Sequence, residues 1–111
     1  MASDEIRIGT TEAIFRAVNE RIAESAQQFE SETAEFVCEC DDRACTHRLE
    51  ASLVDYERVR EDATHFLLAP GHENDDVEQV IERKHRFWIV EKIERTVAAT
   101  VRRLDTRTET A

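Results

Sequence analysis

Three cysteines lie within eight residues, as Cys38-Glu39-Cys40 and Cys45, and the sequence contains no other cysteine. Thiolates at such spacing either hold a metal ion or exchange electrons. Residues two apart in a strand point to the same face, so Cys38 and Cys40 project together. Residues 41–44 read as a polar turn, and across it Cys40 and Cys45 become cross-strand partners about 5 Å apart. Three converging thiolates suit a tetrahedral Zn²⁺ ion, which then needs a fourth ligand.

Two histidines compete for the fourth position. His47 shares a strand face with Cys45, and the hairpin register sets it opposite Cys38, which gives a fully local site. His72 is remote in sequence but belongs to the turn 70–72, where proline fixes one φ and glycine permits a positive φ. A ligand from this turn would tie the C-terminal half to the hairpin, as a structural metal does in a small domain. The residues alone leave both histidines open. His65 and His85 are weaker candidates, because each lies at a strand edge with no thiol nearby in sequence.

Two metal-free readings of the thiols are also open. Buried cysteine is common because it behaves as a small hydrophobe. However, Cys38 and Cys40 flank an acidic residue and Cys45 follows a polar turn, which disfavours burial of all three without a metal. A redox pair is the other reading, although cysteines two apart on one strand face form strained disulfides.

The chain resembles a group of small uncharacterised proteins from high-GC, actinobacterial-like organisms, over about residues 11–93. The resemblance is carried by Phe36-Val37-Cys38-Glu39-Cys40, Cys45-Thr46, Tyr56-Glu57-Arg58-Val59-Arg60, the segment 66–69 with Pro70-Gly71-His72-Glu73, and Ile89-Val90-Glu91-Lys92. In that pattern the position of His47 is usually not histidine. The resemblance therefore favours a metal site of Cys38, Cys40, Cys45 and His72, and it implies no named activity.

Composition limits the classes of protein to which the chain can belong. The 111 residues fit one domain, and the net charge is -10, from 25 acidic and 15 basic residues. Direct binding to nucleic acid or to an anionic membrane is unexpected, because both need clustered Lys and Arg. The sequence shows neither an apolar run of about 20 residues nor a basic, apolar leader. With an odd cysteine count, these features indicate a cytoplasmic protein.

The hydrophobic pattern predicts an α+β fold with one small antiparallel sheet, a long N-terminal helix, a short middle helix and a C-terminal helix, held together by the Cys/His metal site. The expected organisation is a flexible lead-in over 1–9, a single zinc-containing domain over 10–104 and a flexible tail over 105–111. Within the domain we expect a helix over 10–34, a sheet region over 35–92 and a helix over 93–104. The sheet region is expected to hold strands at 35–40, 45–51, 64–69, 77–83 and 86–92, with the middle helix at about 53–62.

The two terminal helices carry apolar positions at helical spacing. In the first, Ile14, Phe15, Val18, Ile22 and Phe29 form one stripe, while Arg16, Glu20, Arg21 and Glu24 lie opposite. The simplest interpretation packs this stripe on the sheet, and the alternative is a surface for a partner helix. In the last helix, the corresponding positions are Ile93, Val97, Val101 and Leu104.

Three functions follow, from most to least favoured. The first is a non-catalytic regulatory or protein-interaction module with a structural Cys3His zinc site. Its expected partner is an unidentified protein, with a homodimer as the alternative. The second is a thiol-based redox sensor that releases zinc on oxidation. The third is an enzyme with an open metal position. We expect no enzyme, because a Cys3His set is coordinatively complete and the sequence contains no P-loop, G-x-G-x-x-G, G-x-S-x-G or HExxH motif.

Overall fold

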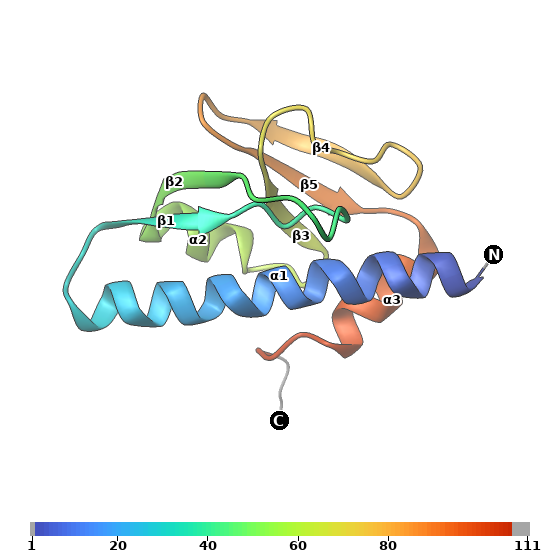
Figure 1. Ribbon diagram of the computed structural model, residues 1–111, viewed down its shortest axis with the longest axis horizontal. Helices are drawn as coiled ribbons and strands as arrows, with labels where there is room; N and C mark the ends of the chain where they lie inside the picture. Colours follow the sequence, from blue (N-terminus) through green and yellow to red (C-terminus); the bar gives the residue numbers. More distant parts are fainter. Residues whose placement is uncertain (1, 108–111) are drawn as a thin grey trace.

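The computed structural model describes residues 2–107 and confirms the α+β class (Figure 1). The elements, in chain order, are α1 (Ala2–Gln28), β1 (Thr33–Val37), β2 (Arg48–Ser52), α2 (Leu53–Val59), β3 (His65–Leu68), β4 (Glu78–Arg83), β5 (Trp88–Lys92) and α3 (Arg95–Arg103). Within residues 2–107, none of the helices is both long and apolar enough to span a bilayer.

The strands form two antiparallel sheets, so the expectation of one sheet is wrong. The first sheet pairs β1 with β2, and the second has the order β3-β5-β4. Ser52 ends β2 and also caps α2, its Oγ accepting a hydrogen bond from the Asp55 amide. Because the chain enters a helix directly after β2, the next strand starts a separate sheet. One hydrophobic cluster nevertheless joins both sheets, with Phe36, Tyr56 and Phe66 fully buried.

Helix α1 is longer at its start and shorter at its end than predicted. The predicted lead-in over 2–9 is helical, and residue 1 lies outside the described residues. Gly9 lies inside the helix at a point where α3 packs closely against it. A Cβ at this position would meet the Thr100 side chain of α3 at 2.9 Å. Thr10, where the predicted helix begins, lies inside α1 and donates its hydroxyl to the Ile6 carbonyl. The helix ends at Gln28 rather than near 34, because Glu30 adopts a left-handed φ of 57°.

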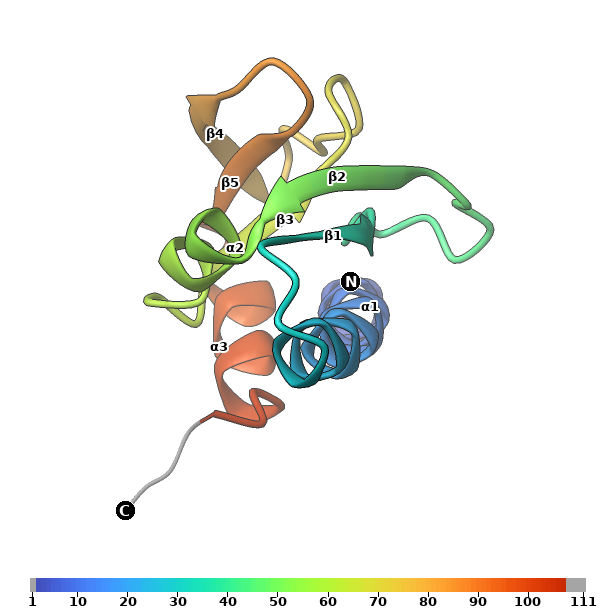
Figure 2. The same ribbon diagram turned by 90° about the vertical axis from the view of Figure 1, so that its left-hand side faces the viewer.

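Most of the apolar stripe predicted for α1 does not face the core, although Ile22 packs against it. Ile14 is 54% exposed, Val18 41% and Phe29 80%. The buried face carries Glu12, Arg16, Asn19 and Ala23, at steps of four, three and four. Helix α1 therefore packs through a mainly polar face, as seen nearly end-on in Figure 2, where it lies beside α3 and under β1.

Buried partners from distant segments contact this polar face, although Glu12 Oε1 has no hydrogen-bond partner among the described residues. The Lys92 ammonium of β5 donates to Glu12 Oε2 at 2.6 Å and also to Glu78, and all three side chains are at most 1% exposed. The Arg16 guanidinium donates to the Val101 carbonyl at 2.6 Å and lies over the Phe66 ring. These contacts join α1 to β3, β5 and α3.

The remaining strand and helix boundaries differ from the prediction by a few residues at each end. Strand β1 stops at Val37, before the cysteines, and β2 begins at Arg48, so the hairpin loop covers 38–47 rather than 41–44. Strand β4 contains a bulge between Val80 and Glu82. Helix α2 stops at Val59, three residues early.

The C-terminal segment is packed further than predicted. Helix α3 buries Val97 and Val101 but leaves Ile93 and Leu104 exposed, so only the two central predicted positions face the core. Beyond it, Asp105 is buried against the Arg60 guanidinium. The predicted tail over 105–111 is thus wrong for 105–107, and 108–111 lie outside the described residues.

Candidate metal centre

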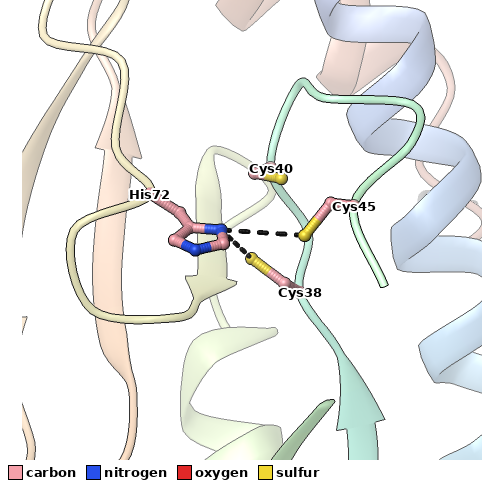
Figure 3. A group of neighbouring side chains, drawn as sticks. All are labelled: Cys38, Cys40, Cys45 and His72. Carbon is pink, nitrogen blue, oxygen red and sulfur yellow. Dashed lines mark hydrogen bonds between the residues drawn. The ribbon is translucent and has the colours of Figure 1, made fainter. Parts of the chain in front are cut away.

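Four side chains from two loops converge at one point (Figure 3). The Nδ1 atom of His72 lies 3.6 Å from Cys38 Sγ and 3.6 Å from Cys45 Sγ. With Cys40, each side chain offers one donor atom, and these atoms all lie within 4.8 Å of one another. Tetrahedral zinc with Zn–S bonds near 2.3 Å has ligand atoms about 3.5–4 Å apart, so this spacing matches a metal site. The structure therefore brings together the four predicted residues.

The three cysteines come from the hairpin loop rather than from paired strands. The β1–β2 register extends one step beyond the strands, where the Cys38 amide donates to the His47 carbonyl at 3.1 Å. The chain then turns at Asp42, whose carbonyl accepts from the Cys45 amide at 2.9 Å and whose carboxylate accepts from the Ala44 amide. This turn returns Cys45 toward the two earlier thiols, as the hairpin model required, although no strand pairing joins Cys40 to Cys45.

Glu39, between the first two cysteines, is the residue that sequence reasoning missed. Its side chain is fully buried. One carboxylate oxygen accepts from the Leu67 amide at 2.9 Å, and the other accepts from Asn19 Nδ2 at 2.7 Å. Asn19 also bonds both backbone groups of Val37. The Glu39 side chain is held by hydrogen bonds to β3 and α1, so Cys38 and Cys40 lie on the side of the chain opposite to Glu39. The sequence signal that could have identified Glu39 is its position between two candidate ligands.

Burial of Glu39 bears on one step of the sequence argument. The acidic residue between Cys38 and Cys40 was expected to disfavour burial of all three cysteines without a metal. Cys38 and Cys40 are only 1% and 2% exposed, and Cys45 is half-buried. Burial also raises the pKa of the Glu39 carboxyl, while the hydrogen bond from Asn19 opposes that rise. The hydrogen bonds from Asn19 and Leu67 thus take the place of the hydrogen bonds that water would make to an exposed Glu39 side chain.

His72 is delivered by the turn that the sequence predicted. Gly71 adopts a φ of 84°, and the His72 amide donates to the Ala69 carbonyl at 3.0 Å. The Ala69 amide in turn donates to Cys38 Sγ at 3.2 Å, so the turn contacts the thiol cluster through its backbone as well. An Asn74 to Asp41 hydrogen bond of 2.9 Å fixes the two loops to each other.

His47, the competing fourth ligand, lies beside the cluster but outside it. Its ring stacks on that of His72, with the centroids 4.5 Å apart and the planes at 22°. His47 is exposed, whereas His72 is half-buried. The stacked ring covers one face of the ligand histidine and limits its rotation. His65 and His85 lie elsewhere, at the start of β3 and between β4 and β5.

The pKa values of the three thiols are shifted in different directions, which bears on how they would lose protons to a metal ion. The hydrogen bond between the Cys38 and Cys40 side chains lowers the pKa of Cys40 to about 5 and raises that of Cys38. Burial raises the pKa of Cys45. A thiolate at Cys40 would provide the first ligand for a cation, which on binding would displace the remaining thiol protons.

The described cysteines are free thiols, and together with one imidazole they form a soft, electron-rich donor set. The arrangement can hold a metal ion, with two ligands buried and two half-buried. In comparisons with known proteins, no family model, curated protein or solved structure matches the chain.

Proposed function

We propose that this protein is a zinc-binding, non-catalytic regulatory or protein-interaction module of a reducing compartment. The observation that carries the proposal is the convergence of Cys38, Cys40, Cys45 and His72, whose donor atoms all lie within 4.8 Å of one another. Three thiolates and one imidazole favour Zn²⁺ among the common divalent ions of the cell, because zinc accepts tetrahedral sulfur and nitrogen ligation.

A structural rather than catalytic role follows from the ligand count. Catalytic zinc keeps three protein ligands and one open position, whereas this set supplies four. The ion would join the hairpin loop 38–47 to the loop after β3, two segments between which the backbone provides few hydrogen bonds. In a chain of 111 residues such a cross-link contributes directly to folding.

An interaction role is supported by the exposed apolar side chains of α1. Ile6, Ile14 and Val18 lie on its solvent side, next to a shallow groove that also includes Ala17, Arg21 and Thr106. In α3, by contrast, the apolar side chains of Val97 and Val101 are buried within the molecule. A protein partner, or a second copy of this chain, would therefore contact α1.

Native mass spectrometry of protein purified without a metal-affinity tag tests the zinc site. We expect one zinc ion per chain in the wild type and in His47→Ala, because His47 only stacks on the ligand histidine. We expect loss of zinc in Cys38→Ser and His72→Ala. His72→Cys restores a fourth ligand and should recover the metal, which separates loss of a ligand from loss of the fold.

A metal-free wild type with three free thiols would refute the zinc proposal. Zinc that remains in His72→Ala and is lost in His47→Ala would instead assign His47 as the fourth ligand. Zinc that remains in both single variants, with a pH-dependent metal-bound water, would favour an open and catalytic site.

A redox sensor is the second candidate, favoured by the unequal exposure of the thiols. Cys45 is half-buried, whereas Cys38 and Cys40 are buried, so a peroxide reaches Cys45 first. The Cys45 thiolate would displace hydroxide from the peroxide to give a sulfenic acid and, after protonation, water. Attack by a neighbouring thiol would then form a disulfide, release a second water and expel the ion. Zinc release by stoichiometric peroxide, reversed by a dithiol, would support this function.

A further inference from the structure

A second group of potential ligands lies at the opposite end of β3 from the cysteine cluster. Asp62, His65 and Glu91 each direct one donor atom to a common point, and these atoms lie within 4.8 Å of one another. His65 begins β3, and its register partner on β5 is Glu91. Asp62 precedes the strand by three residues, in a turn closed by the hydrogen bond from the His65 amide to the Asp62 carbonyl.

The distances within this group exceed those of hydrogen bonds. His65 Nε2 lies 3.7 Å from Asp62 Oδ2 and 3.7 Å from Glu91 Oε2. A direct N–H to O bond would bring either pair to about 2.9 Å. Two carboxylates thus flank one ring nitrogen, with a separation that an ion about 2.1 Å from each donor would bridge.

Each carboxylate is fixed through the oxygen that does not face His65. Asp62 Oδ1 accepts from the Thr64 amide at 2.9 Å and from the Thr64 hydroxyl at 2.8 Å, which leaves Oδ2 directed at the imidazole. Glu91 Oε1 accepts from Gln79 Nε2 at 3.2 Å, which leaves Oε2 directed there. Metal-binding carboxylates are commonly oriented in this way by neighbours outside the ligand set.

The charge and exposure of the group suit a cation with bound water. Two carboxylates beside one imidazole give the group a net negative charge, which the Arg102 side chain of α3 partly offsets at Asp62. The side chains of His65, Glu91 and Asp62 are 23%, 35% and 49% exposed. His65 also lines a cavity of about 190 Å³ next to α2 and β4.

We propose that Asp62, His65 and Glu91 form a second, solvent-accessible site for a divalent transition-metal ion, with three protein ligands and open positions for water or a small anionic ligand. Its nitrogen and oxygen donors differ from the sulfur donors of the first site, so the two sites select different ions. The inference does not depend on zinc at the cysteine cluster, because it uses none of those residues.

Titration of the full-length protein, as purified with its own metal content, with Co²⁺ tests the second site by calorimetry and NMR. Co²⁺ binds a given site more weakly than Zn²⁺, so zinc in the cysteine cluster is retained, and thiolate–cobalt absorption would reveal any entry there. We expect one saturable Co²⁺ site, with paramagnetic effects centred on the start of β3 and on β5.

The variants distinguish a metal site from an ion pair. We expect His65→Ala to weaken Co²⁺ binding more than 100-fold and Glu91→Gln about tenfold or more, while His85→Ala, an exposed histidine elsewhere, leaves it unchanged. Gln79→Ala, which frees Glu91 without removing a ligand, should weaken binding several-fold. The proposal is overturned if the wild type binds no Co²⁺ at millimolar concentration. It is equally overturned if His65→Ala, shown to be folded by circular dichroism, binds Co²⁺ as the wild type does.

Discussion

The cysteine cluster and the polar face of α1 bury ionisable groups in different ways. The Glu12, Lys92 and Glu78 side chains at that face contain their own cation, since the Lys92 ammonium bonds both carboxylates. The cluster contains three thiols and an imidazole, with no lysine or arginine among its hydrogen-bond partners in residues 2–107. The comparison teaches that one region supplies its own cation on folding, whereas the other presents only donor atoms, to which an ion from solution could bind.

Metal removal should give the largest difference in stability between the cysteine cluster and the polar face of α1. Binding of a structural zinc contributes on the order of 10 kcal/mol in small zinc domains, which is comparable to the whole stability of a domain this size. We expect chelation by EDTA to lower Tm by about 15 °C or more, or to abolish the cooperative transition, measured by circular dichroism. Equal melting curves before and after verified zinc removal would contradict the comparison.

Replacing Lys92 should destabilise the packing of the polar face of α1 without changing the metal content. The Lys92→Met variant leaves Glu12 and Glu78 buried without their cation, which we expect to cost about 3–5 kcal/mol. Urea unfolding of the metal-loaded protein measures this cost, and Lys84→Met, at a less buried position, provides the control. If zinc stoichiometry fell with Lys92→Met, the two regions would not be independent.

The pH dependence of stability should report Glu12. Burial raises its pKa from 4.5 to about 8, with the Lys92 charge opposing that rise. The folded state therefore retains a proton that the unfolded chain loses above pH 4.5. This contribution to stability is complete below pH 4.5 and is lost as the pH rises to about 8, by at most about 1.4 kcal/mol per pH unit.

Glu12→Gln should remove that slope. The stability of wild type relative to Glu12→Gln is expected to fall steadily from pH 5 to 8, measured by urea unfolding at each pH. Glu35→Gln, at an exposed position of β1, controls for the loss of a carboxylate. Parallel pH profiles for wild type and Glu12→Gln would show that Glu12 is charged throughout this range.

The smallest effect is expected on the solvent side of α1. Ile14→Ser should change the free energy of unfolding by less than about 0.5 kcal/mol, because Ile14 is 54% exposed. If the apolar stripe faced the core, the same change would cost about 2–4 kcal/mol. The urea midpoint of this variant therefore decides which face of α1 is buried.

The cysteines of the candidate metal site and its turn could be predicted because their sequence signals are local. Cys38, Cys40 and Cys45 lie within eight residues, and the turn before His72 is specified by one proline and one glycine. The choice of His72 over His47 did not follow from the residues alone. It follows in the structure from the loop after β3, which returns to the cluster through the Ala69 amide.

The packing of α1 could not be predicted from periodicity. Its apolar side chains suggested one face, but the buried face carries Glu12, Arg16 and Asn19. The partners that satisfy these side chains are remote in sequence, such as Lys92 for Glu12 and Val101 for Arg16. A hydrophobic pattern contains no information about such pairs, which exist only once the helix meets β5 and α3.

The pairing of Arg60 with Asp105 has a consequence for synthesis of the chain. The Arg60 guanidinium is buried and bonds Glu20 and Asp105, which are 40 and 45 residues away. During translation, α1, both sheets and the cysteine loop emerge from the ribosome before Asp105 does. Until then the Arg60 guanidinium can bond only Glu20 of these two carboxylates, and its contact with Asp105 forms after the C-terminal segment has emerged.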